Sequence, residues 1–220
     1  MVLESQKEVM SLEKIGEGGQ SIVYKIDENW VFKHYKLDSK YPIDFRAIEI
    51  MCNEVNNLKR VIVPIKIDYN ITKNKILGTY SRFVSPQEIE LGNILCSTLY
   101  QWYIELYEDT KVLSSKKIKM IDSVAWNYIL NEDGPFLIDV DSFKFCPEKS
   151  LESVEKENIE DLNYAFLYGF VWKVGQFVAK QSFDEIFEEI SNFKGTLYDF
   201  IKCKNAYDYG KSSVSGTIKR

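Results

Sequence analysis

The chain has 220 residues, of which 45% are hydrophobic and 28% are charged, and its formal net charge is −5. This composition is typical of a globular protein, and the negative balance argues against a surface made for nucleic acid. No apolar run approaches the ~20 residues of a membrane-spanning helix, and the four scattered cysteines form no C-x-x-C pair, so we expect reduced thiols in a cytoplasmic protein.

The N-terminal part of the chain is rich in predicted β-strands. Five runs of β-branched and aromatic residues have the length of strands: Leu12–Ile15, Ile22–Ile26, Trp30–His34, Val61–Ile67 and Ile76–Val84. Between the third and fourth runs, apolar residues recur every three or four positions from about Ile43 to Lys59, which predicts a helix with one buried face. We therefore expect five strands and one helix here.

The C-terminal part is predicted to be mainly helical. Helices are expected over four stretches, namely Ile94–Leu113, Asp161–Val178, Phe183–Phe193 and Thr196–Cys203. Between the first two, Asn127–Leu130 and Phe136–Ile138 are short predicted strands, and the Asp133-Gly134 pair between them favours a hairpin. We expect the polar tail from Lys204 onward to be frayed.

A glycine-rich segment lies between the first two predicted strands. It contains Gly16, Gly18 and Gly19, and Ser21 stands at the third glycine position of a Gly-x-Gly-x-x-Gly pattern. In a dinucleotide-binding fold such a segment opens a helix, whereas the β-branched and aromatic run that follows here favours a strand. A glycine turn in a hairpin lets backbone N–H groups approach phosphates, because no Cβ obstructs them. The alternative is an ordinary hairpin turn.

A phosphate-binding site also needs a fixed positive charge, which an acidic side chain orients. Lys33 ends the apolar run Trp30-Val31-Phe32 and is the preferred candidate, while Lys36 lies beyond the run and is the alternative. The predicted helix that follows offers Glu49 and Glu54 as partners, and we favour Glu54.

Three further polar residues lie next to the predicted hairpin. Asp122 precedes Asn127 by five positions, and Asp139 follows Asn127 by twelve. Such acids often form nothing more than turns beside strands. The hairpin nevertheless brings an Asp and an Asn to the start of one strand and a second Asp to the end of its partner, as phosphoryl transfer requires.

In this order and spacing, the segments resemble the protein-kinase-like superfamily over about Leu12 to Val178. The run Ile-Asp-Val-Asp-Ser-Phe at 138–143 is most similar to minimal or atypical bacterial-type Ser/Thr protein kinases, which are related to aminoglycoside- and choline-kinase-like folds. The resemblance implies an α+β, bilobal fold. Residues 1–84 would form an N-lobe with a five-stranded antiparallel sheet and one helix, residues 85–203 an abbreviated helical C-lobe, and residues 204–220 a flexible tail.

The resemblance also implies a role for each candidate residue. ATP would be bound by a set of residues that includes the glycine loop: Gly16, Gly18, Gly19, Ser21, Val23, Lys33 and Glu54. Val23 would lie under the adenine, and Lys33 would pair with Glu54. Asn127 and Asp139 would bind Mg²⁺. Asp122 and Lys33 would serve catalysis: Asp122 by receiving or orienting the proton of the attacking hydroxyl, and Lys33 by positioning the phosphates.

Several positions depart from the protein-kinase pattern. Met120 and Ile121 replace the usual His and Arg, and Val124 replaces a lysine that contacts the γ-phosphate in many protein kinases. Asp141 stands where Asp-Phe-Gly has its glycine, either near a second metal ion or as a cap for the turn. Asp161 would anchor the backbone of the catalytic loop, and the short stretch before it contains no Ala-Pro-Glu of a long activation segment.

Two functions are compatible with this pattern. The first is an ATP- and Mg²⁺-dependent phosphotransferase that moves the γ-phosphate to a hydroxyl, with a protein Ser/Thr favoured over a small molecule as the unknown acceptor. The second is a pseudokinase, a nucleotide-binding or protein-interaction scaffold, which the departures favour. We favour the enzyme because the five residues tied most closely to the chemistry are all present, namely Lys33, Glu54, Asp122, Asn127 and Asp139. We expect neither nucleic acid nor a membrane as a partner.

Overall fold

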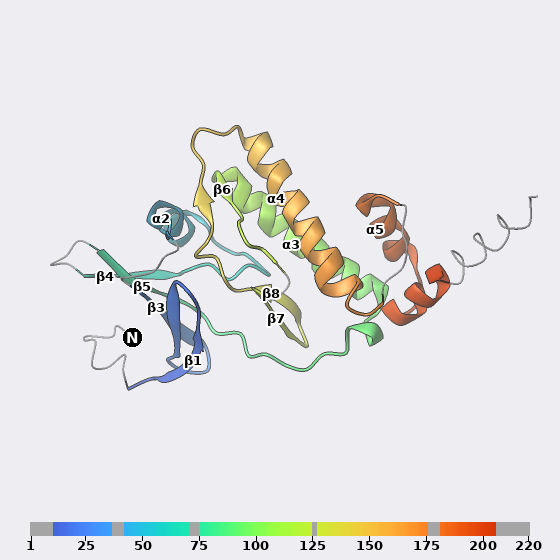
Figure 1. Cartoon of the computed structure of the whole chain (residues 1–220), viewed down its shortest axis with the longest axis horizontal. Coiled ribbons are helices and arrows are strands. Elements are labelled where there is room, and N and C mark those ends of the chain that lie inside the picture. The colour runs from blue at the N-terminus through green and yellow to red at the C-terminus, as the bar shows by residue number, and fades with distance from the viewer. Residues whose placement is uncertain (1–10, 37–41, 71–74, 125–126, 176–180, 206–220) are drawn as a thin grey trace, which may run out of the picture.

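The computed structural model describes residues 11–36, 42–70, 75–124, 127–175 and 181–205. A β-sheet lies at one end of the molecule, and most of the helices lie toward the other end (Figure 1). The expected α+β fold with a five-stranded antiparallel sheet and several helices is confirmed.

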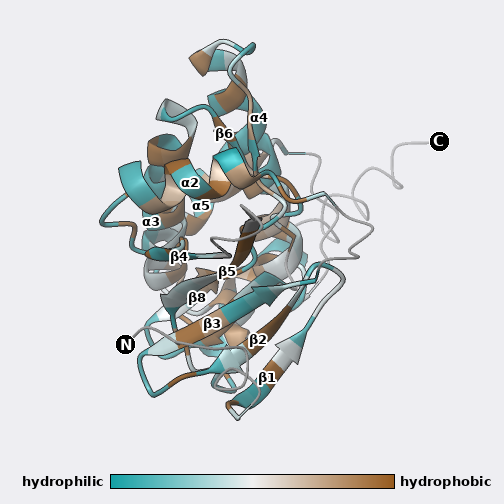
Figure 2. Ribbon diagram, turned by 90° about the vertical axis from the view of Figure 1, so that its left-hand side faces the viewer, coloured by the Kyte–Doolittle hydropathy of each residue, from teal (hydrophilic) through white to brown (hydrophobic). Residues whose placement is uncertain are grey.

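The sheet has the strand order β1-β2-β3-β5-β4, with every neighbouring pair antiparallel. Its strands are β1 (Glu13–Glu17), β2 (Ser21–Lys25), β3 (Trp30–Tyr35), β4 (Lys66–Asn70) and β5 (Lys75–Arg82). Apolar and polar residues follow one another along these strands (Figure 2), as expected where the two faces of a sheet meet different surroundings. On one face, Phe32 and Tyr80 form a small cluster with Tyr24 and Ile26.

Helix α2 (Phe45–Glu54) lies between β3 and β4 in the chain. Asp44 caps its N-terminus, since the side chain accepts hydrogen bonds from the backbone N–H groups of Arg46 (3.0 Å) and Ala47 (3.1 Å). The buried residues Ala47, Ile48, Ile50 and Met51 form its apolar face, whereas Phe45, which the sequence pattern also placed on the buried side, is 42% exposed.

Two predicted boundaries in this region are wrong. The helix predicted to reach Lys59 ends at Glu54, and Asn57 beyond it has a left-handed φ of 61°, outside the helical region. The strand predicted over Val61–Ile67 begins only at Lys66, because Val61 and Ile62 pair with Leu137 of the C-terminal part instead.

The C-terminal part contains α3 (Cys96–Ser115), α4 (Leu151–Phe166), the π-helical turn η3 (Leu167–Val171) and α5 (Phe183–Asn192). The short 3-10 helix η1 (Leu91–Asn93) precedes α3, and residues 197–205 are also helical. None of the helices in the described ranges has the length and apolarity needed to cross a membrane.

The predicted helices that became α3 and α5 are confirmed within two residues at each end. Helix α4 begins at Leu151, where Ser150 caps it, and not at Asp161 as predicted. Val178 lies outside the described residues, but residues 172–175 are not helical, so the helix predicted to reach Val178 is wrong beyond Val171. Of the tail predicted from Lys204, residues 204–205 are helical, and residues 206–220 lie outside the described residues. The early start of α4 places the acidic run 152–157 on a helix, where it does not interrupt the apolar face.

The predicted hairpin is confirmed as β7 (Tyr128–Asn131) paired with β8 (Gly134–Leu137). Its turn requires a glycine at position 134, where φ is 119°. Two further strands, β6 (Ile118–Lys119) and β9 (Lys144–Phe145), pair with each other. They were not predicted, because two residues are too few to show an alternating pattern.

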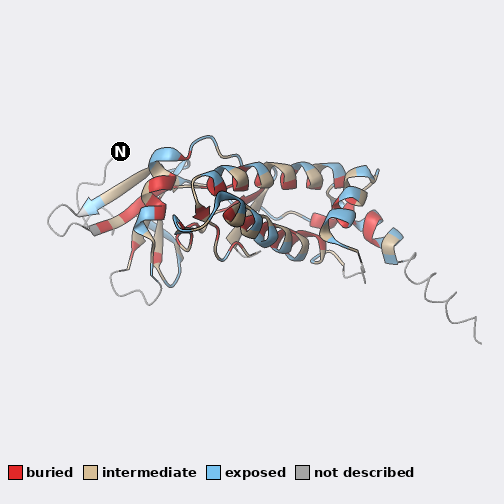
Figure 3. Ribbon diagram, turned by 90° about the horizontal axis from the view of Figure 1, so that it is seen from above, coloured by how far each residue is buried: buried red, intermediate tan, exposed pale blue. Residues whose placement is uncertain are grey.

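A single large core joins α2 to the C-terminal helices. Its fully buried members include Met51 of α2, Leu106 of α3, Leu137 of β8, Phe166 of α4 and Ile190 of α5. Figure 3 shows buried positions on the inner sides of the helices and exposed positions on the outer sides. Helix α2 therefore packs as part of the helical core as well as beside the sheet.

A buried acid on α3 holds the segment between α2 and β4. The Asp109 carboxylate accepts hydrogen bonds from the backbone N–H groups of Lys59 (3.0 Å), Arg60 (2.6 Å) and Val61 (2.9 Å). Burial raises the pKa of Asp109, and the three donors act in the opposite direction. The segment also pairs with β8, since the Leu137 N–H donates to the Arg60 carbonyl at 2.9 Å. Asp109 thus fixes the strand that leads to Asp139.

We expect Asp109→Ala to lower the free energy of unfolding by about 2–4 kcal/mol, because it leaves three backbone N–H groups, two of them buried, without their acceptor. Urea denaturation followed by circular dichroism measures the change. Glu108→Ala is the matched control, since Glu108 precedes Asp109 on α3 and its side chain is 60% exposed. Its effect should stay below about 0.5 kcal/mol. Equal effects would contradict the role given to Asp109.

Candidate active site

The glycine-rich segment forms the turn of the β1–β2 hairpin. Gly16 lies opposite Val23, and the Gly18 N–H donates to the Ser21 carbonyl at 2.9 Å. Glu17 in this turn is hydrogen-bonded by Lys14 and by Lys36, which hold the pKa of its carboxyl at about 2. The turn is therefore closed by its own backbone and by two lysines.

One face of the sheet gathers several candidate residues. Val23 lies directly opposite Lys33 in the β2–β3 register, and Lys33 lies opposite Thr79 in the β3–β5 register. Ser21 is opposite Tyr35 in the next row of the same face. Directly opposed residues have their side chains on one side of a sheet. These side chains therefore form one surface across three strands.

Lys33 reaches from this surface to the loop after β8. Its Nζ lies 3.0 Å from Asp139 Oδ1 and 2.9 Å from Asp141 Oδ2, and its side chain is only 14% exposed. Burial alone would lower the pKa of Lys33, but the charges of Asp141 and Asp139 outweigh it and raise the pKa above its ordinary value. Lys33 is therefore a fixed positive charge beside Asp139. The alternative candidate, Lys36, contacts the glycine turn instead.

The expected pair between Lys33 and Glu54 is wrong in this structure. Glu54 is the last residue of α2, its side chain is 50% exposed, and it forms an ion pair with Lys116 at 3.2 Å. Glu49, the other candidate, accepts a hydrogen bond from the Tyr69 hydroxyl at 3.2 Å. Both helix glutamates thus have partners other than Lys33.

Asp141 is the more deeply buried of the two acids beside Lys33. It is 2% exposed, whereas the side chain of Asp139 is 42% exposed. Asp141 Oδ1 accepts a hydrogen bond from the Tyr35 hydroxyl at 3.0 Å, and Oδ2 lies 3.5 Å from Ser21 Oγ. Burial, and then the charge of Asp141, raises the pKa of Tyr35 well above its ordinary value, so the phenol stays protonated as a donor.

Asp122 and Asn127 form a second part of the site. Asp122 has a left-handed φ of 61°, a conformation that Asp tolerates better than most residues. Its backbone carbonyl accepts a hydrogen bond from the Asn127 side-chain amide at 2.6 Å. Residues 125–126 of this loop lie outside the described residues. The Asn127 amide nitrogen therefore shapes the loop around Asp122, and the amide oxygen is available as an acceptor.

The β7–β8 hairpin brings the loops of Asp122 and Asp139 together, as predicted. The Ile138 N–H donates to the Asn127 carbonyl at 3.0 Å, so Asp139 follows directly after this contact. From the other side, the Ser142 hydroxyl donates to the Ile121 carbonyl at 2.5 Å. Lys33, Asn127, Asp139 and Asp122 thus belong to one region, which Glu54 does not reach. Within the described ranges, no group of three or more His, Cys, Asp or Glu side chains is arranged to hold a metal ion.

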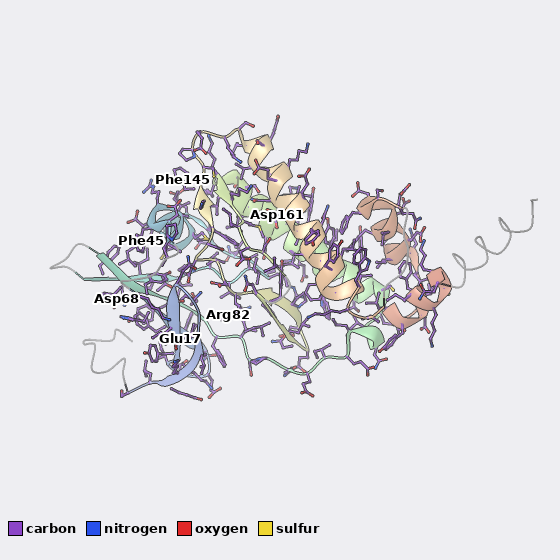
Figure 4. All side chains as sticks on the ribbon, in the orientation of Figure 1. Glu17, Phe45, Asp68, Arg82, Phe145 and Asp161 are labelled. Atoms are coloured by element: carbon purple, nitrogen blue, oxygen red, sulfur yellow. The ribbon has the colours of Figure 1, made fainter. Side chains whose placement is uncertain are left out.

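Asn158, and not Asp161, anchors the segment before Asp122. Its side chain is fully buried and accepts a hydrogen bond from the Met120 N–H at 2.8 Å, and it donates to the Ile118 carbonyl at 2.9 Å. Asp161, labelled in Figure 4, lies on α4 with an exposed side chain. Among the described residues no hydrogen bond joins it to the segment before Asp122, so the expectation that it anchors the backbone of this loop is wrong in this structure.

A hollow of about 320 Å³ opens beside Asp122 on the side of α4. Its lining includes Asp122 and Val124 from the loop and Asp161 and Tyr164 from the helix. Partial burial raises the pKa of the Asp161 carboxyl. Lys33 does not line this hollow. The space is thus separate from the contacts around Lys33 but shares Asp122 with the site.

Two residues that sequence reasoning missed had detectable signals. Tyr35 lies two positions after Lys33 on β3, and residues two apart on a strand share a face. Asn158 lies four positions after Val154 and four before Leu162, both buried on α4, so it interrupts an apolar stripe. A polar residue in such a stripe must find partners inside the protein.

Comparison with known proteins gives no family for this chain. No protein-family model matches it, and a search of the curated proteins finds no match. The chemistry of the site is therefore inferred from its own residues and from their geometry.

We expect Asn158→Ala to lower the free energy of unfolding by about 2–4 kcal/mol, because the Met120 N–H and the Ile118 carbonyl lose a buried partner. Asp161→Ala, one turn further along α4, should cost less than about 1 kcal/mol. Urea denaturation of both variants makes the comparison. A larger loss for Asp161→Ala would restore Asp161 as the anchor.

Proposed function

We propose that the protein is an ATP- and Mg²⁺-dependent phosphotransferase that transfers the γ-phosphate to a hydroxyl acceptor. The observation that carries this proposal is the contact between Lys33 and Asp139, at 3.0 Å across 106 positions of sequence. A phosphate-binding lysine and a metal-binding acid at such close quarters are what phosphoryl transfer requires. The acceptor is a protein Ser/Thr in preference to a small molecule.

The fold supports this proposal. An antiparallel sheet of five strands, with α2 between β3 and β4, agrees with the N-lobe that the resemblance implies. The helices toward the other end agree with an abbreviated C-lobe. We propose that the two parts form the two lobes of a protein-kinase-like fold, with ATP between them.

The face of the sheet that carries Val23 and Lys33 would bind ATP. Val23 is the apolar neighbour of Lys33 and would contact the adenine. A Cβ at Gly18 would have no atom of the protein within 4 Å, so crowding in the chain does not explain the glycine. Close approach of a phosphate to the backbone of Gly18 and Gly19 does explain it. The side chain of Ser21 faces Asp141, so Ser21 would support the glycine turn from the side opposite the phosphates.

Asp139 and Asn127 would hold Mg²⁺. Magnesium is bound in proteins through one or two side-chain oxygens, and phosphates and water complete its coordination. The partly exposed carboxylate of Asp139 and the amide oxygen of Asn127 fit this chemistry. The ion supplies charge neutralisation for the phosphates. Lys33 would hold a phosphate oxygen, and Asp122 would orient the acceptor hydroxyl and take its proton.

The hollow beside Asp122 is where we place the acceptor. A hydroxyl group bound in this hollow would lie next to Asp122, whose carboxylate would take the proton. The side chains of Asp161 and Tyr164 at its border would contact that group. This arrangement leaves the sheet surface to ATP and the helical side to the acceptor.

A pseudokinase is the second candidate. The observation that favours it is that Lys33 forms ion pairs with both Asp139 and Asp141. These charges compensate one another without a nucleotide or a metal ion, so they could serve to hold the fold together instead of catalysis. The four cysteines are free thiols, which supports the proposal that either kind of protein works in the cytoplasm. Metal dependence and turnover distinguish the two candidates.

We expect Mg²⁺ to strengthen ATP binding to the wild type and to have no such effect on Asp139→Ala, which lacks the metal-binding carboxylate. Calorimetric titration of ATP with Mg²⁺ and with EDTA measures this. Asp184→Ala on α5, an exposed acid outside the site, is the control and should behave as the wild type. Metal-dependent binding that survives in Asp139→Ala would refute the assignment.

Asp122→Asn should reduce phosphate transfer by at least about 100-fold, because it removes the proton acceptor. Its affinity for Mg-ATP should not change, since Asp122 would contact the acceptor. Radiolabelled ATP with Ser/Thr peptides and with amino alcohols measures the transfer. A wild type that binds Mg-ATP but neither transfers phosphate nor hydrolyses ATP would favour the pseudokinase.

A further inference from the structure

Lys33 has an unexpected carboxylate partner. The resemblance implies that a glutamate of the helix after the lysine strand orients this lysine. Here Asp141 Oδ2 lies 2.9 Å from Lys33 Nζ, and Glu54 binds Lys116 instead. The orienting acid therefore comes from the loop after β8 and not from α2.

The two acids beside Lys33 differ in what they can do. Asp139 is 42% exposed and can turn toward a cation in the site. Asp141 is 2% exposed and uses both of its oxygens on the sheet, on Lys33 and on Tyr35. A carboxylate in such a position cannot leave its partners without exposing an uncompensated buried charge. Asp141 is thus suited to hold the lysine while Asp139 binds metal.

Helix α2 is fastened in a way that keeps its glutamate away from Lys33. Besides capping α2, Asp44 accepts a hydrogen bond from the Phe145 N–H of β9 at 2.9 Å. Figure 4 shows Phe45 at the start of α2 and Phe145 on the neighbouring strand. At the other end, Glu54 is bound to Lys116. Both ends of α2 are therefore tied to the C-terminal part of the chain.

We propose that Asp141 is the positioning residue for Lys33 and takes the place of the helix glutamate, an inference that rests on the proposed function. Asp141 acts through Lys33 and does not touch ATP. It also holds Ser21, the first residue after the glycine turn, so one carboxylate aligns the lysine with the loop over the phosphates. Lys33 can then exchange Asp139 for a phosphate and keep Asp141.

The test is the binding of ATP and of adenosine to the full chain in EDTA, where no metal contributes. Asp141→Asn keeps the shape of the side chain but removes its charge. We expect it to weaken ATP binding about ten-fold or more, as loss of a charged hydrogen-bonding group does. Adenosine binding should stay within about two-fold, because adenosine has no phosphate for Lys33. A merely structural role would weaken both ligands alike.

Glu54→Gln is the matched variant for the helix glutamate and should leave ATP binding within about two-fold of the wild type, since its side chain is exposed. In a Lys33→Met background, Asp141→Asn should add no more than about two-fold, because its effect runs through Lys33. Tyr35→Phe removes one hydrogen bond to Asp141 and should weaken ATP binding in the same direction, even if Asp141→Asn fails to fold.

The outcomes separate the two proposals. A wild type that binds ATP neither in EDTA nor with Mg²⁺ overturns the proposed function, and this inference with it. If the wild type binds ATP only with Mg²⁺, the same comparison of variants is made with Mg²⁺. A wild type that binds ATP, with Glu54→Gln weakened and Asp141→Asn unchanged, overturns only the inference. Equal losses of ATP and adenosine binding in Asp141→Asn and in Tyr35→Phe would also overturn it.

Discussion

The buried charge of Asp141 is the constraint on which the candidate site depends. A carboxylate that is 2% exposed requires a compensating charge and hydrogen bonds, and removal of one partner of such a pair costs about 3–5 kcal/mol. Lys33 supplies the charge, and Tyr35 supplies a further donor. Because these partners come from the sheet, the loop that carries Asp139 cannot shift relative to β3 without breaking this arrangement.

Most of the sheet, and the strands and turns that carry the candidate site residues, were predictable because each has a local signal. The glycine turn, the strand that ends in Lys33 and the hairpin before Asp139 are each visible within about ten residues of sequence. The hairpin then brings Asn127 next to Asp139 through its register. Strands and turns of this kind are determined mainly by neighbouring residues, so their prediction does not require the rest of the fold.

The partner of Lys33 was not predictable in the same way. Glu54 was preferred because Leu58, four positions on, matches the kinase pattern of a glutamate followed by a buried leucine on one helix, but α2 ends at Glu54. The orientation of α2 depends on contacts with residues remote in the sequence, such as the hydrogen bond from the Phe145 N–H to Asp44. The buried anchors Asp109 and Asn158 escaped for a related reason, since their backbone partners lie about 40 to 50 positions away.

Because Lys33 is paired with Asp141 and not with Glu54, the lysine is coupled to the loop after β8 and not to α2. A lysine held by a helix glutamate is in place only when the helix is docked, whereas a lysine held by Asp141 shares its anchor with the loop of Asp139, two residues away. Lys33 and the loop that carries the proposed metal ligand are therefore anchored by the same carboxylate. Helix α2 packs against the core, where Met51 is fully buried, and under the proposal for Asp141 its position does not decide whether the lysine is aligned.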